Sequence, residues 1–320
     1  MIQKPRAMRD ALLERIHGAM WQDERIFFVC ADFGAPTLDK IRADFPGRFV
    51  NVGIAEQNLI NVAAGLALEG FTVFAYAIAP FITMRCYEQC RTNLALLSTV
   101  RPMNVNLIGV GAGYSYVVSG PTHQCYEDIT LMRALPNFRV LSPSDHVTAG
   151  QLFDVCVGAT GPKYLRFDAQ NLPVLHGGEA PRTENGFTVL KQGNGACIVA
   201  TGYMVHTALN VAAQLEASGH ASTVIDLFDL SHFDQAALLG MLGTHRAVIS
   251  MEEGFGGRGG VDSMLRDLMS RQGAELPLLS VAVEPGYRFE LGDRLTLHEQ
   301  VGIGPRAAEA RIRAFLDRLS

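Results

Sequence analysis

A carboxylate and a histidine are the side chains most able to carry chemistry, and the carboxylate is Glu56. It lies in the segment NVGIAEQN, residues 51–58, in the first turn of a helix expected over 56–69. That helix is apolar almost all round, so we expect the Glu56 carboxyl group to be buried at one end. An acid in the first turn stabilises a helix by a few tenths to about 1 kcal/mol, and many acids do only that. The pattern alone leaves this role and catalysis both open.

His123 follows a glycine-bearing loop over 111–120, at the C-terminal end of a strand expected over 105–110. Ligands of doubly wound sheets bind at that edge, and a histidine there can move protons near neutral pH. The alternative is a histidine that only bonds the loop backbone. The remaining histidines are predicted to be ordinary surface or core residues: His17, His146, His176, His206, His220, His232, His245 and His298.

Three other features have structural explanations. Phe81 and Tyr87 lie six residues apart at the start of a helix expected over 83–97, so they should contact different parts of the protein, with core packing as the default. Cys86 and Cys90 have no CxxC or HxxxH companion, which favours packing over a zinc site. The segment EEGFGGRGG, residues 252–260, does not match GxGxxG in register, and we expect a tight loop with two exposed acids.

Length and composition predict a compact cytoplasmic protein. A chain of 320 residues suggests two domains, and 48% hydrophobic with 18% charged residues gives no sign of disorder. A net charge of −5 without a basic stripe argues against nucleic acid as a partner. The sequence contains neither a membrane-spanning apolar run nor a signal peptide at 1–20. Reduced thiols are expected at every cysteine: Cys30, Cys86, Cys90, Cys125, Cys156 and Cys197.

Strand-like and amphipathic segments alternate along the chain, which predicts an α/β fold with a parallel sheet and crossover helices. The first group comprises helices over 6–21, 56–69, 83–97 and 126–134, and strands over 26–30, 72–76, 105–110, 139–141 and 163–167. The second comprises strands over 197–200, 222–227, 247–251 and 279–283, and helices over 205–218 and 305–319. We therefore expect a first domain over 1–172, a linker over 173–189 and a smaller α/β domain over 190–320.

An ordered set of segments resembles the transketolase family, including deoxyxylulose-phosphate synthase and the β subunits of 2-oxo acid dehydrogenases. The segment VGIAEQN resembles the family's glutamate segment, APFITMRCYEQCR its aromatic helix, and GPTHQCYEDITLMRALPN its histidine loop. LSPSD and YLRF follow in the family's order. The resemblance covers the whole chain, with 190–320 matching more loosely, and it implies a thiamine-diphosphate pyrimidine-binding domain followed by a transketolase C-terminal domain.

The resemblance implies thiamine diphosphate as cofactor and assigns roles to individual residues. Glu56 matches the glutamate that hydrogen-bonds N1′ of the aminopyrimidine and favours its imino tautomer. Phe81 matches the aromatic residue that stacks on this ring, and Ile54 and Tyr87 are expected to line the same site. His123 matches the histidine that contacts the donor and the transferred ketol unit. A buried carboxyl group can share a proton with the ring, so the resemblance favours catalysis for Glu56 and His123.

The family binds the diphosphate and its metal through a GDG-to-asparagine motif in an N-terminal domain, and no GDG occurs in this sequence. The resemblance therefore implies a separate N-terminal subunit that carries the motif and holds Mg or Ca, with no metal on this chain. We expect an α2β2 assembly with the cofactor at subunit interfaces, in keeping with the closed two-fold symmetry of most oligomers.

The sugar-phosphate part of the pattern departs from the family. Gly111 stands where transketolases carry a histidine at the start of the glycine loop, and Ser119 where they carry an aspartate before GPTH. Ala169 stands where they carry the arginine that binds the acceptor phosphate. A bidentate arginine is hard to replace in phosphate recognition, so we expect a specialised or modified sugar in place of ordinary pentose phosphates. The residues expected near the substrate are His123, Gln124, Tyr114, Asp32 and Arg166, the last of which matches a neighbour of the clamp arginine.

The expected activity is transfer of a two-carbon ketol unit from a ketose donor to an aldehyde or sugar acceptor. One alternative is 2-oxo acid decarboxylation with acyl transfer, which would release carbon dioxide from pyruvate. A second is a non-catalytic scaffold subunit, against which Glu56 and His123 both argue. The sequence specifies no donor, acceptor, partner or pathway.

Overall fold

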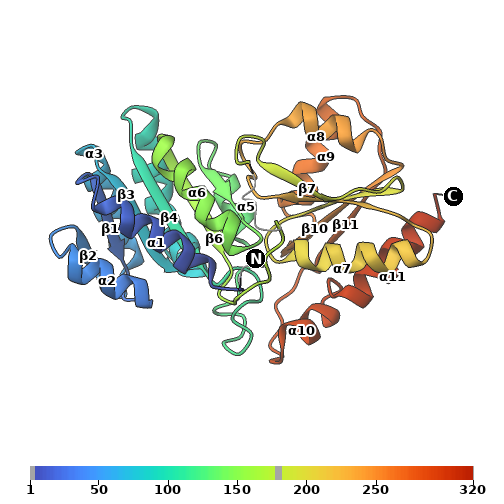
Figure 1. Cartoon of the computed structure of the whole chain (residues 1–320), viewed down its shortest axis with the longest axis horizontal. Helices are drawn as coiled ribbons and strands as arrows, with labels where there is room; N and C mark the ends of the chain where they lie inside the picture. The colour runs from blue at the N-terminus through green and yellow to red at the C-terminus, as the bar shows by residue number, and fades with distance from the viewer. Residues whose placement is uncertain (1–3, 177–181, 320) are drawn as a thin grey trace.

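The computed structural model describes residues 4–176 and 182–319, which form two sheets with helices on both faces (Figure 1). The first sheet has six parallel strands in the order β2-β1-β3-β4-β6-β5. Its strands are β1 (Ile26–Cys30), β2 (Phe49–Asn51), β3 (Thr72–Ile78), β4 (Asn104–Val110), β5 (Arg139–Leu141) and β6 (Gly161–Phe167). The predicted α/β class and parallel first sheet are confirmed.

Helices cover both faces of this sheet, which explains why its central strands are nearly continuous runs of buried residues. One face carries α1 (Met8–Met20), α2 (Pro36–Asp44) and α6 (His146–Gly158). The other carries α3 (Glu56–Leu68), the segment 81–99 and α5 (Asp128–Arg133). The carboxyl ends of the strands are left to loops.

The helix expected over 83–97 begins earlier and is irregular. The π-helical turns η1 (Phe81–Arg85) and η2 (Cys90–Leu96) flank the short α4 (Tyr87–Gln89), and the 3-10 turn η3 (Leu97–Thr99) ends the segment. The Thr83 hydroxyl donates to the Ala79 carbonyl at 2.7 Å, and the Cys86 thiol donates to the Ile82 carbonyl at 2.9 Å. Side-chain bonds of this kind compete with the regular backbone ladder, and the wider turns change which side chains share a face.

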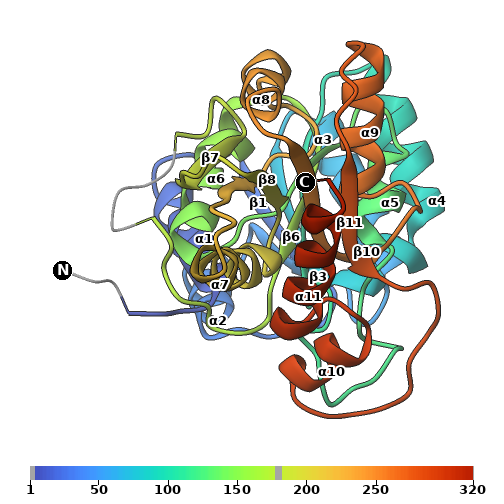
Figure 2. The ribbon, with the colours of Figure 1, turned by 90° about the vertical axis from the view of Figure 1, so that its right-hand side faces the viewer.

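The second sheet has five strands in the order β11-β10-β8-β9-β7, with β7 antiparallel to β9. The strands are β7 (Phe187–Lys191), β8 (Ala196–Ala200), β9 (Thr223–Leu227), β10 (Ala247–Phe255) and β11 (Leu278–Val283). Helices α7 (Met204–Ala217) and α11 (Pro305–Asp317) pack on one face, and α8 (Gln235–Leu242) and α9 (Val261–Arg271) on the other. The short α10 (Arg294–Gln300) lies beside α11 (Figure 2).

The two domains share apolar packing. Ile129 and Met132 of α5 belong to the same buried cluster as Val261 and Met264 of α9. Strand β7 begins inside the segment expected as a linker over 173–189, of which 177–181 lie outside the described residues. The domain limits 1–172 and 190–320 therefore stay a proposal. Within the two described ranges, no helix is long and apolar enough to cross a membrane.

Candidate active site

The predicted site residues gather at the edge where the parallel strands of the first sheet end. Ligand sites of open α/β sheets form at this edge. Asp32 follows β1, Ile54 and Glu56 follow β2, Phe81 and Tyr87 follow β3, Tyr114, His123 and Gln124 follow β4, and Arg166 lies near the end of β6.

Glu56 is the first residue of α3 and is buried, with 2% of its surface exposed. Its Oε2 accepts a hydrogen bond from Nη1 of Arg85 at 2.5 Å. The Arg85 side chain is 42% exposed, and its guanidinium carbon lies 4.3 Å from the centroid of the Phe81 ring. One exposed cation therefore contacts both the buried carboxylate and the aromatic ring.

The Phe81 ring in turn meets the His123 ring edge-on, with centroids 5.3 Å apart. Nδ1 of His123 lies 3.0 Å from the Thr122 hydroxyl oxygen, which leaves Nε2 for other contacts. Glu56, Phe81 and His123 thus form one chain of contacts, linked by Arg85. Sequence reasoning missed Arg85, although its position four residues after Phe81 places it one helical turn away.

The other residues predicted to bind cofactor have different surroundings. The Tyr87 hydroxyl donates to the Leu131 carbonyl of α5 at 3.0 Å, so Phe81 and Tyr87 contact different parts of the protein, as expected. Ile54 is 76% exposed. Asp32 has φ of +48° and exchanges two hydrogen bonds of 3.1 Å with Asn51, which ties the loop after β1 to the end of β2. The cofactor roles of Ile54 and Tyr87 and the substrate role of Asp32 stay predictions.

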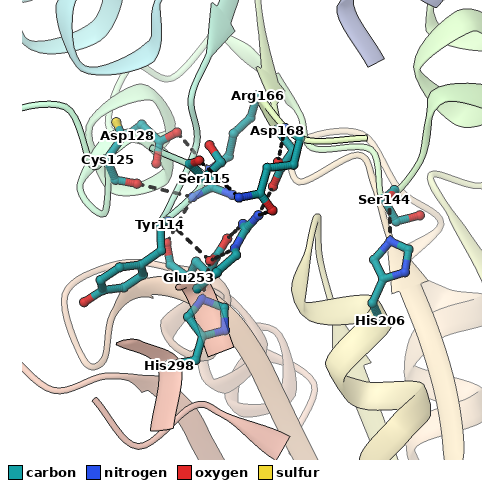
Figure 3. A network of polar contacts seen from close by, with 12 residues as sticks. Tyr114, Ser115, Cys125, Asp128, Ser144, Arg166, Asp168, His206, Glu253 and His298 are labelled. Carbon is teal, nitrogen blue, oxygen red and sulfur yellow. Dashed lines mark hydrogen bonds and ion pairs between the residues drawn. The ribbon is translucent and has the colours of Figure 1, made fainter. Parts of the chain in front are cut away.

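Three of the predicted substrate residues are buried, and Figure 3 shows two of them, Arg166 and Tyr114, beside Glu253 of the second domain. Nε of Arg166 donates to Asp128 at 2.8 Å, and its Nη2 donates to the Glu253 carbonyl at 3.0 Å. The ring centroids of Tyr114 and His298 lie 5.4 Å apart, and Gln124 accepts a hydrogen bond from the Tyr126 hydroxyl. These contacts lend no support to a substrate role for Arg166, Tyr114 or Gln124.

The expectation of two exposed acids at 252–260 is wrong. Glu252 and Glu253 are each 1% exposed and belong to β10, which continues to Phe255. Oε1 of Glu252 accepts from the Asp262 amide at 3.1 Å in the first turn of α9. Glu253 instead pairs with Arg294 and His298. Arg294 and His298 lie far from Glu253 in the sequence, so the local sequence around Glu253 could not indicate these contacts. His298 is therefore a core histidine that belongs to a buried ionic network.

The structure of the glycine loop explains why position 111 is a glycine and not the histidine of the family pattern. Gly111 has φ of +104°, and a Cβ at that position would lie 2.1 Å from the Tyr116 ring. The Tyr116 ring therefore occupies the space that a larger side chain at 111 would need. The same ring lies 6.4 Å from the His123 ring, so Tyr116 forms a wall of the region beside His123.

Comparison with known families decides the relationship. Residues 4–174 match the model of the transketolase pyrimidine binding domain, and residues 186–307 match that of the transketolase C-terminal domain. The chain belongs to the transketolase family. The resemblance stated from the sequence is thereby confirmed, as is the pairing of these two α/β domains.

Individual relatives agree with this assignment. One subunit of the apulose-4-phosphate transketolase of Actinobacillus succinogenes is 33% identical over 260 residues, covering 81% of this chain and 82% of that protein. The 1-deoxy-D-xylulose-5-phosphate synthase of Parasynechococcus marenigrum is 32% identical over 82% of this chain but only 40% of that enzyme. A solved split-gene transketolase, an inactive β4 tetramer, superimposes with a TM-score of 0.84 at 31% identity, covering 97% of this chain and 98% of that one.

A pyrimidine-binding domain implies thiamine diphosphate, and the site residues fit its aminopyrimidine half. A buried carboxylate beside a half-buried aromatic ring provides a hydrogen-bond acceptor and a stacking face. Among residues 4–176 and 182–319, no group of three or more His, Cys, Asp or Glu side chains is placed to hold a metal ion. All six cysteines are free and buried, as expected for reduced thiols.

Proposed function

We propose that this chain is the pyrimidine-binding subunit of a split, thiamine-diphosphate-dependent transketolase that moves a two-carbon ketol unit from a ketose to an aldehyde or sugar. The contact chain from Glu56 through Arg85 and Phe81 to His123 carries this proposal. It brings a carboxylate, an aromatic face and a proton-transferring group together at one sheet edge.

The residues of this chain would divide the work as follows. Glu56 would hold the pyrimidine ring through its carboxylate, and Phe81 would stack on the ring. His123, whose Nδ1 is engaged by Thr122, would use Nε2 to bind a hydroxyl group of the sugar and exchange its proton. Thiamine diphosphate, when bound, supplies the carbon nucleophile.

A partner subunit would hold the diphosphate and its Mg or Ca, because this chain matches subunits of divided enzymes over 82% and 98% of their own length. The split-gene relative and the apulose-4-phosphate transketolase, itself built from subunits, support a divided enzyme. The relative whose β chains alone form a tetramer is inactive, which agrees with a need for the other subunit. We propose an α2β2 assembly in the cytoplasm.

The substrate is proposed to be a specialised sugar. Ala169 replaces the arginine that binds the acceptor phosphate in the family, Gly111 and Ser119 replace a histidine and an aspartate, and the Tyr116 ring lies against Gly111. The relative that acts on apulose 4-phosphate supports the wider point that split transketolases are not limited to common pentose phosphates.

The experiment is turnover by the complex of this chain with its GDG-bearing partner on a panel of phosphorylated and unphosphorylated ketoses. Ketol transfer predicts that a ketose is cleaved and an aldehyde is extended, without carbon dioxide. Carbon dioxide from pyruvate would instead favour the 2-oxo acid reaction. A complex with no turnover, in wild type and Glu56→Ala alike, would favour the scaffold.

A further inference from the structure

Glu253 brings a charged carboxylate of the second domain to the domain boundary. Its Oε1 and Oε2 accept from Arg294 at 3.0 and 2.6 Å, and Oε1 also lies 2.6 Å from Nε2 of His298. Burial alone would raise the pKa of the Glu253 carboxyl, but Arg294 and His298 more than offset this and hold the pKa well below its usual range. Glu253 is therefore an ionised, doubly paired group.

This carboxylate lies directly beneath the glycine loop of the first domain (Figure 3). The Tyr114 amide donates to Oε1 of Glu253 at 3.3 Å. Gly113 has φ of +55°, and a Cβ there would lie 2.2 Å from Oε2 of Glu253, so the loop approaches the carboxylate as closely as only glycine permits. Glu253 of the second domain and residues 113–114 of the first domain are therefore in close contact.

The contact lies at the base of the loop that carries His123. Gly113 and Cys125 exchange two backbone hydrogen bonds of 2.9 and 3.0 Å, which close the loop over 113–125. Nη2 of Arg166 donates to the carbonyls of both Cys125 and Glu253, at 3.4 and 3.0 Å. The Glu253 carboxylate therefore contacts one arm of the loop base directly. The other arm is reached through Arg166 and the main-chain carbonyl of Glu253, a contact that does not depend on the Glu253 side chain.

We propose that Glu253 is a positioning residue through which the second domain holds the loop that presents His123. The functional consequence rests on the proposed function, because it needs His123 to contact substrate. The holding of the loop does not, since it depends on the position of the Glu253 carboxylate against Tyr114 and Gly113.

The test compares Glu253→Gln with Glu252→Gln in the complex with the partner subunit. Both glutamates are 1% exposed neighbours on β10, but Glu252 contacts the start of α9 and not the loop. Glutamine keeps the size of the side chain and removes the charge that holds Arg294 and His298. Hydrogen exchange of peptides spanning 113–125 should quicken about tenfold in Glu253→Gln and remain as in wild type in Glu252→Gln.

Activity gives a second readout. Donor turnover should fall about tenfold or more in Glu253→Gln, while thiamine diphosphate affinity stays unchanged, because Glu56 and Phe81 lie on other segments. Unchanged exchange in 113–125, or a rise shared equally by peptides of β1 and β3, would overturn the proposal. Should Glu253→Gln fail to fold, His298→Leu removes one donor to the same carboxylate and should loosen the loop less.

The two proposals fail in different ways. Faster loop exchange in Glu253→Gln, within a wild-type complex that turns over no ketose, would support the holding of the loop and contradict the proposed function. Normal ketose turnover together with unchanged hydrogen exchange of the loop in Glu253→Gln would support the proposed function and contradict the holding of the loop.

Discussion

Arg85 contacts the two groups, the Glu56 carboxylate and the Phe81 ring, that the proposed function assigns to the pyrimidine ring. A ligand that uses both groups must displace the guanidinium. Because the Arg85 side chain is 42% exposed, its pair with Glu56 should be worth at most about 1 kcal/mol.

Arg85→Gln should therefore tighten thiamine diphosphate binding by up to about fivefold in the complex, measured by calorimetric titration. Arg91→Gln is the matched control, because Arg91 makes an exposed pair with Glu88 at 3.8 Å in the same segment. Weaker binding in Arg85→Gln would mean that Arg85 helps to hold the cofactor.

Glu56→Gln keeps the shape of the buried side chain and removes its charge. If Glu56 acts on the pyrimidine ring, ketol transfer should fall by about 10²–10⁴-fold, with little change in melting temperature. Glu88→Gln, on an exposed position, should leave turnover unchanged. Comparable turnover in Glu56→Gln and wild type would rule out the catalytic role of Glu56.

Local pattern was enough to place some of these residues and not others. The burial of Glu56 follows from an apolar helix, and the position of His123 follows from a glycine loop after a strand. The contacts of Glu253 with the glycine loop and of Arg85 with Glu56 join segments far apart in the sequence. No periodicity encodes such contacts, which explains why Arg85 was missed and Glu253 was expected at the surface.

At the scale of elements, β10 carries two neighbouring buried glutamates with opposite electrostatics. Burial raises the pKa of Glu252 to about 7, whereas Arg294 and His298 overcome the effect of burial at Glu253. Because the folded pKa of Glu252 exceeds its unfolded value of about 4.3, this group stabilises the fold most at low pH. That contribution is lost as the pH rises from about 4.3 to about 7.

Between pH 5 and pH 8 the wild type should therefore lose about 3 kcal/mol of unfolding free energy through Glu252 alone. Glu252→Gln has no proton to lose and should show a correspondingly smaller fall, measured by urea unfolding at both pH values. Parallel pH profiles for the two proteins would show that Glu252 does not titrate in this range.

Length alone did not decide which elements were predicted: the three-residue β5 matches its expected range of 139–141, whereas the 11-residue α9 had no predicted range. Helices α1, α3, α7 and α11 and strands β1, β4 and β8 lie close to their expected ranges. The three-residue β2 and the short α8 and α10 carry too few residues for a period to emerge. The π-helical turns at 81–85 and 90–96 depend on local side-chain bonds, which a 3.6-residue period does not register.

At the scale of the whole molecule, Arg294 joins the domains electrostatically. It forms ion pairs of 2.6 Å with Asp168, which follows β6, and with Glu253 of β10. Its guanidinium carbon also lies 3.5 Å from the centroid of the Tyr203 ring. Removing it leaves two buried carboxylates without their shared cation.

Arg294→Met should lower the free energy of unfolding by about 3–5 kcal/mol, measured by urea denaturation. Arg271→Met is the control, since the Arg271–Asp267 pair is exposed and should contribute less than about 1 kcal/mol. Equal stabilities for these two variants would contradict a structural role for the interdomain pair.

The proposed function requires that this chain supply half of a thiamine-diphosphate site and that a partner supply the rest. Affinity purification from the native host, with mass spectrometry of bound protein and cofactor, is the measurement to make first. We expect a stoichiometric partner that carries a GDG motif, with thiamine diphosphate retained in the complex and lost in Glu56→Ala. Tight cofactor binding by the chain alone, or the absence of both partner and cofactor, would contradict it.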